Sequence, residues 1–524
     1  MQLSNYEVIL PLKDKAHYLL YNGVYVAFDV VDKACGQALL EGNLDNLPEE
    51  ELRRLLSRGH ITDSPETETE DIEIIAAVNR KFYQERSLSL MLLPTYDCNF
   101  RCPYCFERHR LSCGKEWLKK TMSKDLVDAV FEATEKEKQR GVKVEGLTLY
   151  GGEPLLKENA DLIRYISGKA IDAGMTLSAV TNGYDLEYYR DILKEYKFKQ
   201  LQITLDGVRE DNDKRRLYIG GGGSYEKILE NVAIALDAGV EVVIRINVGP
   251  ENIKRAPELP RIFKERGYAD NPLFSYYFAP TEGERYPGKD HGVRYRDLVD
   301  MLTDNGFELA DAMKKVSYYN NAYGGIQTII ENKDYFKPRL AHCGAENNQY
   351  MVDPEGNIYS CWDFVAMEEM KVGSIDIDKR KYAFNFNLLK WNHRTVDHLP
   401  ECRSCPYLFV CGGGCAAKAY REKGDPWTSD CDATKEIFYD TAIEVCGRAF
   451  EKTGKGELGK SIKDMLSVYT PEERKDLLTS RDAARLAELL KKSRIDEVAK
   501  NITEGMVVEI EGSVDHRGPI YEWY

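Results

Sequence analysis

The sequence predicts an α/β protein with an incomplete parallel barrel at its centre, a small domain before the barrel and a cysteine-rich region after it. Six strand-like segments between residues 87 and 280 each lead into a helical stretch, and seven cysteines gather between residues 343 and 431. Alternating strands and helices form parallel sheets through right-handed crossovers. Because six units are fewer than the eight of a closed barrel, we expect a partial barrel that is open along one side.

Length and composition limit the class of protein. At 524 residues the chain is long enough for roughly two to four domains. With 43% hydrophobic and 30% charged residues it has a globular composition, and we expect no membrane association. A net charge of −15 argues against nucleic-acid binding, which needs a basic surface. Residues 1–20 lack a secretory signal, so we expect a cytoplasmic protein whose cysteines are metal ligands or catalytic groups rather than disulfides.

The first 75 residues are expected to form a small domain of strands followed by helices. The expected strands, rich in β-branched and aromatic residues, are 6–12, 17–22 and 23–30. Apolar residues at helical spacing predict helices over 31–42 and 48–59. The acidic segment 62–73 has the composition of a linker, and a helical pattern follows over 72–85.

The alternation of strands and helices begins near residue 87. The expected strands are 87–95, 144–150, 176–182, 201–207, 240–248 and 273–280. Helices are expected over segments such as 123–141 and 224–239, with Ser224 as the cap of the second. Regular order is expected to end near residue 310, where metal sites rather than a large apolar core organise the chain. Helix returns after residue 447, in segments 461–469 and 483–493.

Three closely spaced cysteines follow the first expected barrel strand. Cys98, Cys102 and Cys105 fall within eight positions, and the stretch 95–107 offers no fourth cysteine or histidine. A structural zinc site needs four ligands, whereas a [4Fe-4S] cluster held by three thiolates keeps one iron free for another ligand. The alternatives are a zinc site completed from elsewhere in the chain and ordinary buried cysteines. Parallel α/β barrels place their active sites at the carboxyl ends of the strands, which is where these cysteines are expected to lie.

A glycine-rich acidic turn follows the second expected strand. Gly151 and Gly152 let the backbone approach a ligand closely, and Glu153 can accept hydrogen bonds from an ammonium group. Together with the cysteines one unit earlier, this turn resembles the signature of the radical S-adenosylmethionine (radical SAM) superfamily, which is CxxxCxxC after the first strand and a GGE-type turn after the second. The resemblance implies a TIM-like partial (β/α)6 radical SAM barrel.

The resemblance also implies a cofactor site. The three cysteines are expected to hold a [4Fe-4S] cluster, and its open iron is expected to bind S-adenosylmethionine (SAM), which reduction cleaves to a 5′-deoxyadenosyl radical. The residues that match cofactor-binding positions are Tyr104 for the adenine, Gly152 and Glu153 for the methionine amine, Thr204 at the end of the fourth strand and Arg216 for the carboxylate. Arg215 is an alternative to Arg216, and Asn182 either contacts the cofactor or shapes its turn.

The seven later cysteines, four of them spaced CxxCx5CxxxC, resemble the SPASM extension of radical SAM enzymes, which carries two auxiliary [4Fe-4S] clusters. Two zinc sites are the alternative. A hairpin turn at Gly356 is expected to deliver Cys361 from its returning strand. The outer cluster is expected on Cys402, Cys405, Cys411 and Cys431. The inner cluster is expected on Cys343, Cys361 and Cys415.

The inner set is one ligand short. Either Cys35, Cys113 or Cys446 completes it, or the fourth iron is open and binds a substrate thiolate, as expected of a thioether-forming enzyme. Cys35 and Cys446 are also compatible with ordinary buried positions.

The resemblance implies an enzyme that acts on a peptide. The first hypothesis is a maturase that forms a thioether or carbon–carbon crosslink in a ribosomally made precursor peptide. The second is an anaerobic sulfatase maturase that generates formylglycine, and the third is a cluster-bearing peptide-binding or electron-transfer protein without radical chemistry. A flavodoxin- or ferredoxin-type protein is the implied reductant. No catalytic base can be assigned, although Asp206, Asp363 and several tyrosines are candidates.

Two features separate these hypotheses. The N-terminal domain resembles a winged-helix recognition element that binds a leader peptide as an added edge strand, and the alternative is that it only covers the barrel. Sulfatase maturases carry Asp directly after the cysteine that matches Cys361, whereas this chain has Trp362 and then Asp363. The expected organisation is a recognition domain (1–75), a linker or the end of a bridging helix (76–86), the barrel (87–310), the SPASM region (311–446) and a helical extension of unknown role (447–524).

Overall fold

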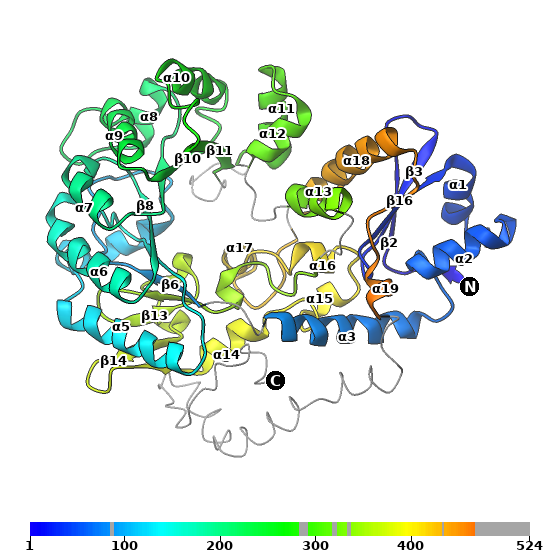
Figure 1. The fold of residues 1–524 in the computed structure, drawn as a ribbon, viewed down its shortest axis with the longest axis horizontal. Helices are drawn as coiled ribbons and strands as arrows, with labels where there is room; N and C mark the ends of the chain where they lie inside the picture. The colour runs from blue at the N-terminus through cyan, green and yellow to red at the C-terminus, as the bar shows by residue number, and fades with distance from the viewer. Residues whose placement is uncertain (84–87, 282–291, 317–321, 333–336, 432–433, 467–524) are drawn as a thin grey trace.

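The computed structural model describes residues 1–83, 88–281, 292–316, 322–332, 337–431 and 434–466. In Figure 1 the barrel lies on the left, the cysteine-rich region in the centre and the small N-terminal domain on the right. Within the described residues, no helix is both long enough and apolar enough to cross a membrane.

The barrel sheet confirms the six predicted strands. They are β6 (Ser89–Leu92), β7 (Gly146–Leu149), β8 (Thr176–Thr181), β9 (Gln200–Thr204), β10 (Glu241–Val248) and β11 (Phe274–Pro280). Each strand pairs in parallel with the next one along the chain. Successive parallel pairing brings all six carboxyl ends to one edge, which is where open α/β sheets bind their ligands.

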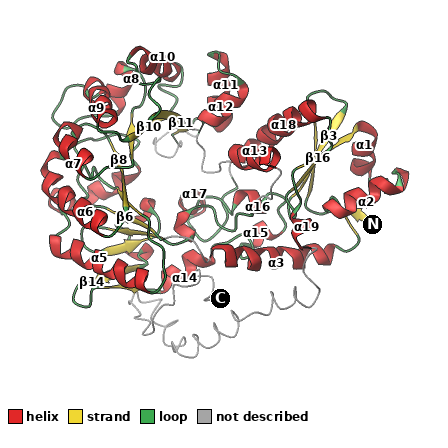
Figure 2. Ribbon diagram, in the orientation of Figure 1, coloured by secondary structure: helices red, strands yellow, loops and turns green. Residues whose placement is uncertain are grey.

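Helices cover the outer face of this sheet, as Figure 2 shows on the left of the molecule. They are α5 (Lys124–Gln139), α6 (Ala160–Asp172), α7 (Arg190–Glu195), α8 (Arg209–Arg215), α9 (Tyr225–Asp237) and α10 (Leu259–Glu265). Each longer helix presents an apolar face to the strands; α9, for example, buries Ile228, Val232 and Leu236. This aliphatic layer fixes the strands and therefore the loops at their ends.

The prediction that the side chain of Ser224 caps α9 is wrong. Ser224 occupies the position before the helix, but its hydroxyl donates to the carbonyl of Arg216 at 3.2 Å. The carboxylate of Asp213 instead accepts from the backbone N–H groups of Ser224 and Tyr225, at 2.8 and 2.9 Å. Because Asp213 lies eleven positions upstream, a local capping pattern could not have identified it.

The sheet continues beyond the predicted barrel. The additional strands are β12 (Gln349–Val352), β13 (Asn357–Tyr359), β14 (Gly373–Asp376) and β15 (Lys381–Phe384). β12 pairs in parallel with β6, and the others follow antiparallel, giving a ten-stranded sheet. The expected end of regular order near residue 310 is therefore wrong, because strands of three or four residues are too short to show a period. The hairpin predicted at Gly356 is confirmed between β12 and β13.

The cysteine-rich region is otherwise made of short helices joined by loops, near the centre of Figure 1. Before it lie α11 (Tyr295–Asp304), α12 (Leu309–Lys315) and α13 (Ala322–Asn332). Within it lie α14 (Phe386–His393), α15 (Pro400–Arg403), α16 (Leu408–Cys411) and α17 (Ala416–Lys423). The longer α18 (Thr434–Thr453) then leads the chain toward the N-terminal domain.

The N-terminal domain confirms its three predicted strands and two predicted helices. They are β2 (Glu7–Pro11), β3 (His17–Asn22), β4 (Ala27–Asp32), α1 (Lys33–Glu41) and α2 (Glu49–Arg58). A fourth strand, β16 (Glu457–Leu458), comes from the other end of the chain and pairs antiparallel with β4. In Figure 1 this orange segment lies against the blue sheet. The helical pattern expected after residue 447 therefore holds for α19 (Ile462–Leu466) but not for β16. Segment 483–493 lies outside the described residues.

The linker expected over residues 62–73 is wrong for most of its length. α3 runs from Pro65 to Tyr83. Its acidic residues are not simply solvated: Glu68 accepts from the hydroxyl of Ser4, and Asp71 accepts from that of Tyr25 at 2.7 Å. Composition suggested a linker because acidic residues are normally exposed, and the hydroxyl partners are distant in sequence.

Candidate cofactor site and cysteine clusters

The loop that carries the first three cysteines packs directly against the glycine-rich turn. The backbone N–H of Glu153 donates to the carbonyl of Asp97 at 2.7 Å. A Cβ atom on Gly152 would lie 2.3 Å from that same carbonyl oxygen, and Gly152 has a φ of +51°. Only glycine fits this close approach without strain. The motifs after β6 and β7 therefore form one structural unit.

A cavity of about 180 Å³ opens at the carboxyl ends of the strands, beside this unit. All three cysteines line it, together with all five residues that the sequence matched to SAM-binding positions. These residues are Tyr104, Gly152, Glu153, Thr204 and Arg216. A second cavity, of about 310 Å³, adjoins the same cysteines and is also lined by Asp97, Glu107 and Arg110. Residues from four separate loops thus converge on one place.

The chemistry of the three thiols fits an iron–sulfur cluster. Burial raises the pKa of Cys98 well above its usual range, and Glu153 and Cys102 add to the shift. Burial likewise raises the pKa of Cys105 to about 12, with Glu107 and Cys102 contributing. A metal is what ionises such thiols. No group of three His, Cys, Asp or Glu side chains in the described part of the chain converges on a single ion. Ligands of a cluster bind different irons and need not converge.

Glu153 is fully engaged in shaping the site. Its buried carboxylate accepts from the hydroxyl of Thr181 and from the backbone N–H groups of Asn182 and Leu155, at 2.6 to 2.9 Å. Burial raises its pKa to about 7 even though these hydrogen bonds oppose the shift. Glu153 therefore ties the turn after β7 to the end of β8. It is also ready to ionise beside a cation.

The structure separates the two neighbouring arginines. Arg216 lines the cavity and its guanidinium donates to the hydroxyl of Tyr104 at 3.1 Å. Arg215 instead pairs with Asp206 and Glu251, and its guanidinium lies 4.8 Å from the centre of the Tyr104 ring. Of the two, Arg216 is the one placed to meet an anionic group in the cavity.

Asn182 shapes its turn, and its contact with the cofactor stays a prediction. It lines the cavity, and its side chain also accepts from the backbone of Tyr184 at 2.9 Å and donates to Asn99 at 2.7 Å. Asn99 lies in the cysteine loop, so Asn182 links the end of β8 to that loop.

Comparison with known proteins agrees with this geometry. The family model described as the radical SAM superfamily matches residues 92–260. This chain carries a radical SAM domain. A cysteine-type anaerobic sulfatase-maturating enzyme from Clostridium novyi is 24% identical over 67% of this chain and 95% of its own length.

Two further relatives place the radical SAM domain in a wider context. The antilisterial bacteriocin subtilosin biosynthesis protein AlbA from Bacillus subtilis is 25% identical over 61% of this chain and 65% of its own length. The solved structure of tagged anSMEcpe with bound AdoMet superimposes with a TM-score of 0.53 at 19% identity, covering 70% of this chain and 96% of that one. The shared fold thus extends beyond residues 92–260.

Several cavity residues of the radical SAM domain were not anticipated. Gln202 and Arg245 point into the barrel from β9 and β10, two positions before Thr204 and Asn247 respectively. Tyr277 of β11 joins them: its hydroxyl donates to Gln202 at 2.9 Å and accepts from Arg245 at 3.3 Å. The signal was present, because polar residues two apart in an otherwise apolar strand share one face.

Trp362 reaches the radical SAM cavity from the cysteine-rich region. It lines the cavity and stacks on Tyr150, with ring centres 5.6 Å apart. Its backbone carbonyl accepts from the guanidinium of Arg110 at 3.2 Å. Arg110 also forms an ion pair with Glu107, which in turn accepts from the N–H of Gly152 at 2.9 Å. A chain of polar contacts thus connects the two cysteine-bearing regions.

The later cysteines are coupled by charge within each of the two predicted ligand sets, and their roles as cluster ligands stay a prediction. Burial raises the pKa of Cys402 above its usual range, and Cys411, Cys405 and Cys431 add to the shift by charge repulsion. Burial does the same for Cys361, with Asp363 and then Cys415 and Cys343 adding to the shift. Mutual repulsion of this kind requires proximity. Four cysteines therefore lie together in one group and three in the other.

The candidates for a fourth inner ligand lie in different surroundings. Cys35 is buried in the core of the N-terminal domain, beside residues such as Leu55. Cys446 is buried on α18. Their burial agrees with ordinary core positions. Cys113 is exposed at the end of the short helix Phe106–Cys113.

A buried arginine organises the cysteine-rich region. Arg394 donates to the carboxylate of Glu346 at 2.7 Å, and Glu346 accepts from the backbone N–H of Cys343 at 3.0 Å. Arg394 also donates to the carbonyls of Gly414 and Thr428, at 2.8 and 2.7 Å. One guanidinium therefore holds loops from both cysteine groups.

The two carboxylates considered as catalytic bases are both engaged with arginine. Asp206 pairs with Arg215 and accepts from Asn247 at 3.1 Å, whereas Asp363 pairs with Arg421 at 3.1 Å. Neither lines the cavity of about 180 Å³. The structure therefore gives no support to either as the base.

Proposed function

We propose that this protein is a radical SAM maturase that crosslinks residues of a ribosomally made precursor peptide. The observation that carries the proposal is the single cavity lined by Cys98, Cys102 and Cys105 and by the five matched SAM-binding residues. An open iron beside groups able to bind an ammonium and a carboxylate is what SAM requires.

The role of the chain's own residues would be to bind the cluster and SAM and to orient the substrate. Cys98, Cys102 and Cys105 would hold the catalytic cluster, Glu153 faces the expected amine and Arg216 the expected carboxylate. When bound, the cluster and SAM supply a 5′-deoxyadenosyl radical that removes a hydrogen atom from a substrate carbon. The protein supplies position and a cavity that excludes water, because the difficult chemistry belongs to the cofactor.

The auxiliary clusters would occupy the two later cysteine groups. Cys402, Cys405, Cys411 and Cys431 would bind one cluster with four protein ligands. Cys343, Cys361 and Cys415 would bind the other with three, which leaves one iron for a substrate thiolate. When bound, these clusters would supply sites that accept electrons, and a flavodoxin- or ferredoxin-type protein would reduce the catalytic cluster.

Two features support a peptide substrate, and a third argues against a sulfatase maturase. A sulfatase-maturating enzyme and a bacteriocin biosynthesis protein, AlbA, match 67% and 61% of this chain. The N-terminal domain has a sheet whose β4 edge accepts an added strand. Trp362 replaces the acidic residue expected of a sulfatase maturase at this position. We take the cytoplasm, where precursor peptides are made, as the site of action.

A sulfatase maturase is the second candidate. The Clostridium novyi relative favours it, because this chain covers 95% of that enzyme. Against it stands the absence of a free carboxylate next to Cys361, since Asp363 pairs with Arg421.

Mass spectrometry separates the candidates. Reduced, reconstituted protein is incubated anaerobically with SAM and with the precursor peptide encoded beside its gene. A crosslinking maturase yields a product that has lost two hydrogen atoms and resists fragmentation between the joined residues. A formylglycine product reacts with a hydrazide probe instead. A peptide that wild-type protein leaves unmodified, or that Cys102→Ala modifies as well as wild type does, contradicts both assignments.

A further inference from the structure

The edge of β4, where a strand can be added to the N-terminal sheet, is occupied by the chain itself. Segment 455–463 runs along this edge, with Glu457 opposite Asp29 and Leu458 opposite Phe28. The backbone N–H of Val30 donates to the carbonyl of Gly456 at 2.7 Å. An incoming peptide that adds to this edge must therefore take the place of these residues.

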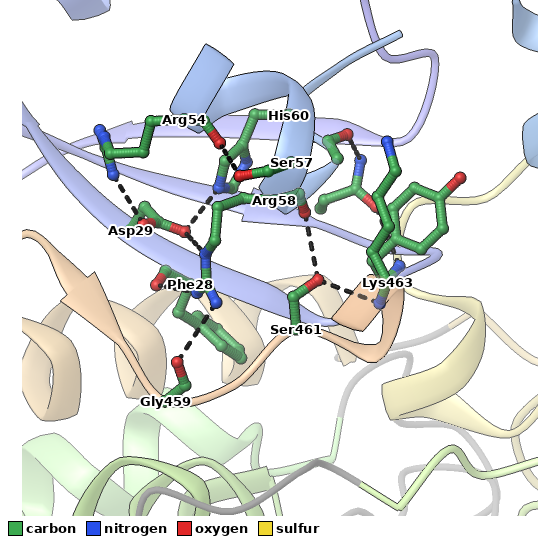
Figure 3. A network of polar contacts seen from close by, with 12 residues as sticks. Phe28, Asp29, Arg54, Ser57, Arg58, His60, Gly459, Ser461 and Lys463 are labelled. Carbon is green, nitrogen blue, oxygen red and sulfur yellow. Dashed lines mark hydrogen bonds and ion pairs between the residues drawn. The ribbon is translucent and has the colours of Figure 1, made fainter. Parts of the chain in front are cut away.

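The segment is fastened at its far end by α2 and by the turn before β4. Figure 3 shows Arg58 donating to the carbonyl of Gly459 and the hydroxyl of Ser461 donating to the carbonyl of Arg58, at 3.3 and 3.2 Å. The ammonium of Lys463 donates to the carbonyl of Leu56 at 2.7 Å. Only the contact at Gly459 uses the backbone of the segment, whereas the other two come from the side chains of Ser461 and Lys463.

At the β4 edge itself, positions 456 and 458 of the segment also require particular residue types. A Cβ atom on Gly456 would lie 2.7 Å from the carbonyl oxygen of Val30, so the edge admits only glycine there. Leu458 is 4% exposed and packs in the main core, whereas Glu457 between them is exposed. Gly459 has a φ of +75°, which lets the chain turn away. The edge therefore selects an extended Gly-x-apolar-Gly sequence.

Residues of its own domain hold the β4 edge in addition to the segment. The carboxylate of Asp29, on β4, is fully buried and accepts from Arg54, Arg58 and His60, at 2.7 to 2.8 Å. These partners lie on or just after α2 (Figure 3). The strand is thus held by its own domain, which leaves the edge formed when the segment departs.

Room for an exchange exists beside the segment. A cavity of about 1260 Å³ lies between α1, α2 and the stretch 455–460. It follows the same edge, and its lining includes Val30, Asp32 and Leu458. An extended peptide can therefore lie next to the segment before replacing it.

We propose that segment 455–463 is an intramolecular ligand of the β4 edge, and that a precursor peptide with an extended Gly-x-apolar-Gly stretch displaces it on docking. This inference rests on the proposed function for the identity of the incoming peptide. The segment keeps the edge from pairing with unrelated strands, a hazard of any open edge. It also makes docking a competition between two strands of similar sequence.

The test uses the full-length protein and a fluorescein-labelled synthetic peptide that reproduces residues 453–464. Leu458→Asp and Gly456→Val in the protein release the segment, because each removes one requirement of the edge. We expect both variants to bind the peptide roughly tenfold more tightly than the wild type, the effect of one buried leucine. Glu457→Gln, at the exposed position between them, should bind like the wild type. A labelled peptide that itself carries Leu458→Asp should not bind.

Unsubstituted protein provides an independent measurement. Excess peptide should accelerate hydrogen exchange at residues 456–459 while β4 stays protected. Equal binding by wild type and released variants, or unchanged exchange at 456–459 with bound peptide, overturns the inference. The binding assay measures docking and not modification. Binding of the probe as expected, without modification of any precursor peptide, would therefore support the strand exchange and remove the proposed function.

Discussion

The two cysteine-bearing regions reach a similar chemistry by different means. In the barrel, the cysteine loop follows a sheet whose helix-facing residues, such as Leu92, Leu149 and Ile203, are fully buried. In the later region the cysteines lie on short helices and loops, and Arg394 connects them by hydrogen bonds to backbone carbonyls and to Glu346. A large apolar core fixes the position of the first cysteine group. The hydrogen-bonded network around Arg394, called here the Arg394 hub, fixes the second.

The difference has consequences for tolerance to change. An apolar core loses stability in small steps when a methyl group is removed. A buried ionic network loses much more stability at a single substitution. Removing one charged partner leaves the other buried without solvent or counter-charge. The second region should therefore be the more fragile of the two, although both are expected to bind clusters.

The largest effect is expected from breaking the hub. Arg394→Met should destabilise the cysteine-rich region by about 3–5 kcal/mol, because the buried carboxylate of Glu346 loses its arginine counter-charge. Reconstituted wild type should contain about twelve iron atoms for three clusters, and the variant about four. Iron and sulfide analysis measures this directly.

The matched control is Arg403→Met, an exposed arginine in the same region that pairs with Glu73. It should keep the wild-type iron content, since exposed pairs contribute little. Equal iron in Arg394→Met and wild type would show that the hub does not hold the cysteines.

The N-terminal domain contains a second buried ionic network, around His60, whose contribution to stability should depend on pH. Burial alone would lower the pKa of His60, but Glu7 and Asp29, both bonded to its ring, raise it to about 9. Because the folded pKa exceeds the unfolded value near 6.5, this stabilisation is complete below pH 6.5 and is lost as pH rises through 9. The loss is on the order of 3 kcal/mol.

Urea unfolding of wild type and His60→Gln at pH 6.5 and pH 9 checks this. The difference in stability between the two proteins should be large at the lower pH and small at the higher. A difference that does not change with pH would mean that His60 is neutral in the folded state.

A moderate effect is expected where the two regions meet. Arg110→Met removes the contacts to Glu107 and to the carbonyl of Trp362, so the turn at Gly152 loses its support. SAM should bind roughly tenfold more weakly, the equivalent of one charged hydrogen bond. Calorimetry on the reconstituted protein measures the affinity. Arg164→Met, whose partner Glu195 lies on the outer surface, should bind SAM normally.

The smallest effect is expected in the barrel core. Ile203→Val should reduce stability by about 1 kcal/mol and leave iron content unchanged. Thermal melting and iron analysis of one preparation give both values. Loss of iron from this variant would remove the contrast between the two regions.

The sequence predicted what depends on local pattern. The six barrel strands and the hairpin at Gly356 have a period or a turn that can be recognised within ten residues. The cavity residues Tyr104, Gly152 and Glu153 followed from their motifs.

The rest depended on contacts between distant segments. β16 has two residues, and its pairing with β4 spans most of the chain. Arg394 carries no pattern that distinguishes it from a surface arginine, and α3 resembled a linker because the hydroxyl partners of its carboxylates lie elsewhere. Long-range pairing and buried polar groups are determined by tertiary structure, which periodicity does not encode.

The central claim is that three thiols hold a cluster with one iron open to SAM. Anaerobically reduced, reconstituted protein incubated with SAM should release 5′-deoxyadenosine, and Cys102→Ala should reduce that release to the level without protein. Wild-type protein that releases none, or a variant that releases as much as the wild type, would contradict the account.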